Sequence, residues 1–183
     1  MTLAAASLSL SGCAHDQTDA SLAEFEANLA AHASATRALE QWCESRGIAD
    51  PATISAVPVK APPGTPPEDL YQLLNAPADT ILGYRHVQLT CGDVVLSEAH
   101  NWFVPARLTA EMNRQLHETN VPFGKVAAAL NFTREPLGSA RRGDPACPAG
   151  AISTHRALLR LPDGQPLALV VECYSEANLK VTD

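Results

Sequence analysis

The stretch from Leu82 to Pro105 constrains the fold more than any other part of the sequence. Apolar residues alternate with polar ones on both sides of Cys91-Gly92-Asp93, which has the composition of a tight turn. Two half-buried strands joined by such a turn form a β-hairpin. Arg85 falls inside the first strand, where a charged side chain must reach either solvent or an anionic partner. Arg85 is therefore the first candidate for a binding residue.

A second hairpin is predicted at the C-terminal end of the chain, where residues 152–161 and 165–174 flank Pro162-Asp163-Gly164. Shorter strands are indicated at residues 54–59 and 131–134. Helical spacing of apolar residues is found in the segments 21–29, 34–47, 65–74 and 108–116. Because hairpins take the place of alternating strand and helix units, we expect an α+β fold with an antiparallel sheet and helices on one face.

Composition limits both the size of the protein and its partners. At 183 residues and 46% hydrophobic, the chain can build one domain with a proper core. Its formal net charge of −7, without any Lys/Arg run, argues against nucleic acid as a partner. No apolar stretch reaches the roughly 18 residues of a membrane span.

The N-terminal residues have the pattern of an export signal. Leu3 to Leu10 is a short apolar run, and Leu10-Ser11-Gly12-Cys13 resembles the bacterial lipobox, in which the cysteine is lipidated. We therefore expect residues 1–20 to be a lipoprotein signal and tether, and residues 21–183 to be a single domain. The protein would then be anchored to a membrane through Cys13 and face the periplasm. A chance cysteine in a disordered tail is the alternative.

Four further cysteines, Cys43, Cys91, Cys147 and Cys173, form an even set that suits disulfides in an oxidising compartment. Strand parity places Cys91 on the same side as Arg85, whereas Cys173 faces away from its neighbour Glu172. If Arg85 and Glu172 share a face, a bridge between Cys91 and Cys173 is disfavoured. The pairing Cys43–Cys91 with Cys147–Cys173 is then favoured, and four reduced thiols remain the alternative.

No cysteine or histidine spacing suggests a metal site, and no cofactor is expected. His100, His117 and His155 are scattered along the chain, and His86 is expected on the exterior of the sheet.

Several short motifs occur in an order that resembles the chorismate pyruvate-lyase family. They are Ser34-Ala35-Thr36-Arg37, Tyr84-Arg85-His86-Val87-Gln88-Leu89, Val104-Pro105, Val121-Pro122-Phe123-Gly124, Thr133-Arg134, Arg160-Leu161-Pro162-Asp163-Gly164-Gln165-Pro166 and Val171-Glu172. Where that family tends to have Gly-Arg, this chain has His100-Asn101.

The resemblance implies a fold, a pocket and a set of site residues. The fold would be a chorismate lyase-like, six-stranded antiparallel sheet that encloses its ligand under helices. Arg85 and Glu172 would be the charged residues of the pocket, and the main-chain amides near Phe123 and Ala35 would face the ligand.

The chemistry of these side chains agrees with that implication. A buried Arg grips a carboxylate through two hydrogen bonds, and a buried Glu accepts from a hydroxyl or donates a proton. Without a pocket, the same Arg and Glu would be a cross-strand ion pair on a solvated face.

Two functions follow for a small anionic, aromatic or enolpyruvyl ligand. The first is a carbon–oxygen lyase that eliminates pyruvate from chorismate, with Glu172 and Arg85 as catalytic residues. The second is a periplasmic lipoprotein that binds such a ligand in the same pocket without turning it over.

Overall fold

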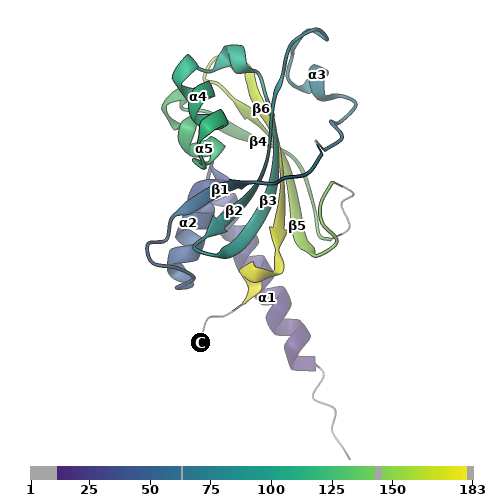
Figure 1. Cartoon of the computed structure of the whole chain (residues 1–183). Helices are drawn as coiled ribbons and strands as arrows, with labels where there is room; N and C mark the ends of the chain where they lie inside the picture. The colour runs from purple at the N-terminus through teal and green to yellow at the C-terminus, as the bar shows by residue number, and fades with distance from the viewer. Residues whose placement is uncertain (1–11, 63, 143–145, 181–183) are drawn as a thin grey trace, which may run out of the picture.

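Six strands in the described part of the chain form one antiparallel sheet in the order β1-β2-β3-β6-β5-β4 (Figure 1). A computed structural model describes residues 12–180, except residues 63 and 143–145, and of residues 12–20 it describes the backbone alone. The strands are β1 (Ile54–Pro58), β2 (Gly83–Cys91), β3 (Val94–Phe103), β4 (Thr133–Ala140), β5 (Ala151–Arg160) and β6 (Pro166–Ser175). The predicted hairpins β2–β3 and β5–β6 are confirmed, and they join in the middle of the sheet where β3 pairs with β6.

Helices cover one face of this sheet, which we call the helix face. They are α1 (Gly12–Ala30), α2 (Ala35–Ser45), α4 (Ala110–Glu118) and α5 (Phe123–Val126). The short α3 (Leu70–Leu73) packs on the opposite face, which we call the outer face. Three 3-10 turns complete the described structure: η1 (Pro105–Arg107), η2 (Ala128–Leu130) and η3 (Glu176–Leu179). The architecture is the α+β fold that the sequence predicts.

The helix face carries two separate apolar clusters. One joins α1 and α2 to the β1 side of the sheet, with Phe25 and Trp42 at its centre. The other joins α4 and α5 to the far ends of the central strands, with the Phe103 ring packed at a tilt against the Phe123 ring. Between them the face is polar, because Asn101 of β3 and Glu172 of β6 project there.

Local sequence explains the helices that frame this polar zone. In α2, Ala38, Leu39, Trp42 and Cys43 are buried, which gives one apolar stripe at helical spacing. Thr109 caps α4 by accepting a hydrogen bond from the backbone N–H of Met112 at 3.1 Å.

Two disulfides, Cys43–Cys91 and Cys147–Cys173, are present, and the favoured pairing is confirmed. Cys43 and Cys91 tie α2 to β2 on the helix face. Cys173 lies on the outer face, where it ties β6 to the segment that precedes β5.

Three boundaries differ from the sequence prediction. α1 begins at Gly12, so the backbone of residues 12–20 is helical where a tether was expected. α3 has four residues and begins at Leu70, because Thr65 to Asp69 do not adopt a helical conformation. The strand expected at residues 131–134 is instead β4, which continues to Ala140.

The predicted signal segment before Gly12 and the side chain of Cys13 lie outside the described residues. Among the helices that the structure does describe, none combines the length and the apolar character needed to cross a membrane.

Candidate functional site

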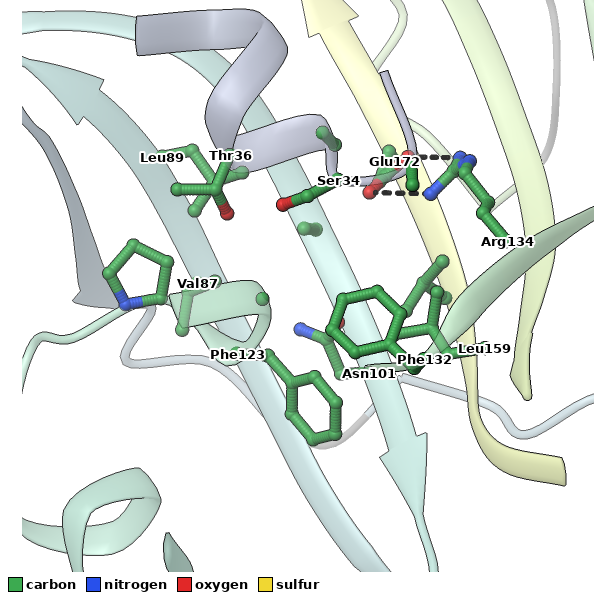
Figure 2. Close-up of a pocket in the computed structure, with 16 residues that line it drawn as sticks. Ser34, Thr36, Val87, Leu89, Asn101, Phe123, Phe132, Arg134, Leu159 and Glu172 are labelled. Atoms are coloured by element: carbon green, nitrogen blue, oxygen red, sulfur yellow. Dashed lines mark hydrogen bonds and ion pairs between the residues drawn. The ribbon is translucent and has the colours of Figure 1, made fainter. Parts of the chain in front are cut away.

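A small polar cavity lies between the two apolar clusters of the helix face (Figure 2). Its volume is ≈ 30 Å³, which is room for about two water molecules. The sheet forms its floor, and the N-terminal end of α2 and the start of α5 form its roof. The residues that line it are Ala33, Ser34, Ala35, Thr36, Val87, Leu89, Ala99, Asn101, Pro122, Phe123, Gly124, Phe132, Arg134, Leu159, Val170 and Glu172.

Three neutral polar side chains of this cavity have no hydrogen-bond partner among the described residues: Ser34, Thr36 and Asn101. Asn101 is 6% exposed and Thr36 is 4% exposed. Figure 2 shows the two hydroxyls directed from α2 toward the centre of the cavity, above Asn101. Thr36 and Asn101 are buried and Ser34 is half-buried, so the three side chains present unpaired polar atoms to one cavity, where a polar ligand or water can pair with them.

The N-terminal end of α2 adds backbone donors to this set. The first hydrogen bond of the helix runs from the N–H of Ala38 to the carbonyl of Ser34, so the N–H groups of residues 35–37 have no acceptor within the helix. Ser34 occupies the N-cap position, yet its side chain makes no capping hydrogen bond. Free N–H groups and the helix dipole together favour an anion at this point.

The close contact between α5 and α2 requires a glycine. A Cβ atom on Gly124 would lie 2.7 Å from the Ser34 Oγ and 3.3 Å from the Thr36 Oγ1. Gly124, in the motif around Phe123, therefore allows α5 to pack closely against the N-terminal end of α2, and these two helices form the roof of the cavity.

Glu172 is paired with Arg134 at one end of the cavity. Two hydrogen bonds join the guanidinium to the carboxylate, at 2.6 Å and 3.3 Å (Figure 2). The Tyr174 hydroxyl donates a third at 3.0 Å. The side chains of Arg134 and Glu172 are 14% and 7% exposed. Charge-assisted, bidentate pairs of this kind are among the strongest hydrogen bonds in proteins.

The surroundings shift the titration of the neighbouring groups. Burial alone would lower the pKa of Arg134. The attraction of the neighbouring Glu172 carboxylate and its hydrogen bonds act in the other direction, and the net effect is a raised pKa. Burial, reinforced by Glu172, raises the pKa of Tyr174 well above its ordinary value, so the phenol keeps its proton. Burial lowers the pKa of His155, which faces Glu172 across the β5–β6 pair.

Arg85 lies beside the cavity rather than in it. It is on the helix face, opposite Asn101 in the β2–β3 register, but its guanidinium donates to the carbonyls of Val121 at 3.0 Å and Thr119 at 3.2 Å. Burial lowers the pKa of Arg85. Arg85 thus holds the segment that leads into α5 and positions the roof of the cavity.

The structure therefore brings together three of the four residues that the sequence singled out, Glu172, Phe123 and Ala35, while Arg85 lies next to them. The residue that meets Glu172 is Arg134, which the sequence offered in the Thr133-Arg134 motif and as a further candidate for an anion site. Asn101 was visible in the sequence as the residue that stands where the lyases tend to have Arg.

Comparison with known proteins places the chain in a family. No protein-family model matches it. The uncharacterized protein y4mC of Sinorhizobium fredii is 38% identical over 173 residues, and the match covers 84% of this chain and 73% of y4mC. The chain belongs to the y4mC family.

Solved structures support the fold of this y4mC relative. The effector domain of PhnF from Mycobacterium smegmatis superposes with a TM-score of 0.54 at 13% identity, covering 79% of this chain and 90% of that domain. A structure of PhnF itself gives a TM-score of 0.55 at 13% identity, covering 82% of this chain and 67% of PhnF. The possible transcriptional regulator YydK from Bacillus subtilis matches at 11% identity and a TM-score of 0.49; the match covers 71% of this chain and 62% of YydK.

The two PhnF matches establish the fold and not the activity. The effector domain of PhnF and the present chain share an open six-stranded antiparallel sheet with helices, which is the chorismate lyase-like fold. The fold expectation is confirmed, and membership of the lyase family itself stays a prediction. The absence of a nucleic-acid partner also stays a prediction.

Proposed function

We propose that this protein binds a small carboxylate-bearing ligand in the cavity of the helix face and does not turn it over. The observation that carries the proposal is the unpaired polar set that faces the cavity, formed by Ser34 and Thr36 at the N-terminal end of α2 and by Asn101 on the sheet. In PhnF the similar structure is an effector domain, which supports a binding role for the same fold here.

The polar set fits the carboxylate of such a ligand. The α2 N–H groups and the two hydroxyls can donate to its oxygens, and the Asn101 amide can donate from the sheet side. The walls are apolar side chains, Val87, Leu89, Phe123, Phe132 and Leu159, which suit a ring or a short hydrocarbon body.

The Arg134–Glu172 pair argues against a lyase mechanism. Glu172 accepts three hydrogen bonds, two from Arg134 and one from Tyr174, which is the pattern of an ionised carboxylate. A carboxylate in that state has no proton to give to a leaving ether oxygen. Arg134 in turn is engaged by Glu172, so the pair closes one end of the cavity as a neutral unit.

Access for a ligand requires the roof to move, because ≈ 30 Å³ is far smaller than the 300–1,000 Å³ typical of ligand pockets. The roof consists of the first turn of α2 and of α5, which has only four residues. Rotation of the Phe123 and Phe132 rings would add space without breaking a strand.

Calorimetric titration with benzoate, 4-hydroxybenzoate and chorismate tests the proposal. We expect saturable binding of at least one of these probes, and no absorbance of 4-hydroxybenzoate when the protein is incubated with chorismate. Steady release of 4-hydroxybenzoate would establish the lyase instead. Absence of binding by all three probes would count against the carboxylate site.

Replacing Asn101 with leucine should weaken binding of the aromatic carboxylate roughly 10- to 100-fold, because a hydrogen bond to a charged group is lost in a desolvated site. Leucine has the branched shape of asparagine without its polar atoms, but it is bulkier. Asn101→Ala, which removes the amide and leaves space instead, should therefore also weaken binding. Asn120→Leu is the matched control, because Asn120 is exposed and lies outside the cavity lining. Equal affinities of the two variants would contradict the role assigned to Asn101.

We also propose that the protein is exported and anchored through lipid on Cys13. The support is the lipobox pattern at Leu10-Ser11-Gly12-Cys13 together with two disulfides, which persist in oxidising compartments. When the full chain is expressed in a bacterial host with a radioactive fatty acid, the protein should become labelled. The Cys13→Ser variant should carry no label, and the control variant Ser7→Ala should be labelled like the unmodified protein. Label that persists on Cys13→Ser would contradict the anchor.

A further inference from the structure

A cluster of potential metal ligands lies on the outer face, away from the cavity described above. His86 of β2 stands directly opposite His100 of β3, and Glu98 lies two residues before His100 on the same side of β3. The sequence predicts no metal site because these residues are scattered along the chain; hairpin pairing is what brings them together. One ligand atom from each of the three residues lies within 4.8 Å of the others.

The side chains of the cluster are held by one another and by their surroundings. The His86 Nε2 lies 2.8 Å from the Glu98 Oε1, and the two imidazole rings stack with their centroids 4.1 Å apart. The Nδ1 of His86 is buried and has no hydrogen-bond partner among the described residues. An unpartnered buried nitrogen is costly, and two stacked imidazoles repel each other if both are protonated.

His100 is oriented by a partner outside the cluster. Its Nδ1 lies 2.8 Å from the Tyr84 hydroxyl, which also accepts a hydrogen bond from the N–H of Gly64 at 2.9 Å. With the proton on Nδ1, the Nε2 of His100 presents its lone pair to the other two residues. A second ring nitrogen bonded to a fixed oxygen is typical of a histidine that binds a metal.

We propose that His86, Glu98 and His100 form a binding site for a divalent transition-metal ion of the Zn²⁺ class. Two imidazoles and one carboxylate are a known zinc ligand set that leaves a fourth position open. Nitrogen-rich sites favour Zn²⁺ or Cu²⁺ over Mg²⁺ and Ca²⁺, which prefer oxygen ligands.

The environment of the cluster suits an ion that exchanges with solvent. The side chains of His86 and Glu98 are 12% and 21% exposed, whereas His100 is buried at 7%. His100 therefore forms a buried side of the site, and His86 and Glu98 remain accessible to solvent.

The open coordination position has space beside it. His100 also lines an outer-face cavity of ≈ 500 Å³, together with Trp102, Val171 and Arg156. The Nε of Arg156 is buried and unpaired among the described residues. A bound cation and this guanidinium would together draw an anion into that cavity as an additional ligand.

Titration of tag-free, disulfide-intact protein with Zn²⁺ alone tests the site. At neutral pH we expect one equivalent to bind, and Cu²⁺ in its place should give an electron paramagnetic resonance spectrum with coupling to two imidazole nitrogens. Glu98→Gln and His86→Gln should each weaken Zn²⁺ by about 100-fold or more, since loss of an outer partner alone typically costs 10- to 100-fold. His117→Gln, an exposed histidine on α4, should leave the affinity unchanged.

Glu98 and His86 are chosen because they are partly exposed, so their variants are expected to fold, which near-UV circular dichroism and the melting temperature check. Absence of saturable Zn²⁺ binding to the unmodified protein would overturn the proposal. Binding that survives in both variants, or that weakens equally in His117→Gln, would overturn it too.

Discussion

Replacing Arg134 with methionine should lower the free energy of unfolding by about 3–5 kcal/mol, because it leaves the Glu172 carboxylate buried without its cation. Glu172 is 5% exposed, and Arg134 supplies two of the three hydrogen bonds that it accepts. Urea denaturation followed by tryptophan fluorescence measures the loss. The expected loss is far larger than for an exposed pair, which contributes about 0–1 kcal/mol.

Arg160→Met is the matched control for that experiment. Arg160 of β5 pairs with Glu135 of the neighbouring strand β4, but on the surface of the protein. A double variant, Arg134→Met with Glu172→Leu, should recover much of the stability, since apolar replacement of a whole buried pair is often neutral. A loss below about 1 kcal/mol in the single variant would mean that Glu172 is hydrated in the native state.

Removing the Cys43–Cys91 disulfide through paired alanine substitutions should lower the free energy of unfolding by about 4 kcal/mol, because the bridge closes a 48-residue separation in the unfolded chain. The Cys147–Cys173 bridge spans 26 residues and should contribute about 3.5 kcal/mol on the same basis. Denaturation of each paired variant without reductant measures both values. An unchanged free energy of unfolding would show that the bridge does not form in solution.

The sheet could be predicted because its signals are local. Alternation around Cys91-Gly92-Asp93 and around Pro162-Asp163-Gly164 defined both hairpins, and these became β2–β3 and β5–β6. β4 was harder to define, because Pro136 and Gly138 are turn residues in most contexts. An edge strand with a bulge tolerates both, and the register of β4 shifts between these two residues.

The start of α1 was missed for a different reason. Residues 15–20 are polar, which indicated a tether, but they contain neither proline nor glycine. Leu22, Phe25 and Leu29 bury one side of the helix in the core, and nothing in the preceding residues prevents it from continuing upstream to Gly12.

The site could be predicted only in part, because a charge pair depends on strand order. The family resemblance put Arg85 and Glu172 in one pocket, and both side chains are on the helix face. Which arginine meets Glu172 follows from the long-range order β3-β6-β5-β4, which brings β4 within reach of β6 across a single strand. Periodicity does not encode that order, so Arg134 could not be chosen over Arg85.

The Cys43–Cys91 bridge restrains the C-terminal end of α2 and leaves its N-terminal end without a disulfide. Cys43 lies near the C-terminal end of this helix, where the indole N–H of Trp42 also donates to the carbonyl of Asn178 at 3.2 Å. The first turn, with Ser34 and Thr36, has no covalent restraint and touches the cavity. The disulfide therefore anchors α2 to β2 at the end away from the cavity, and the proposed ligand would meet the end of the helix that no disulfide restrains.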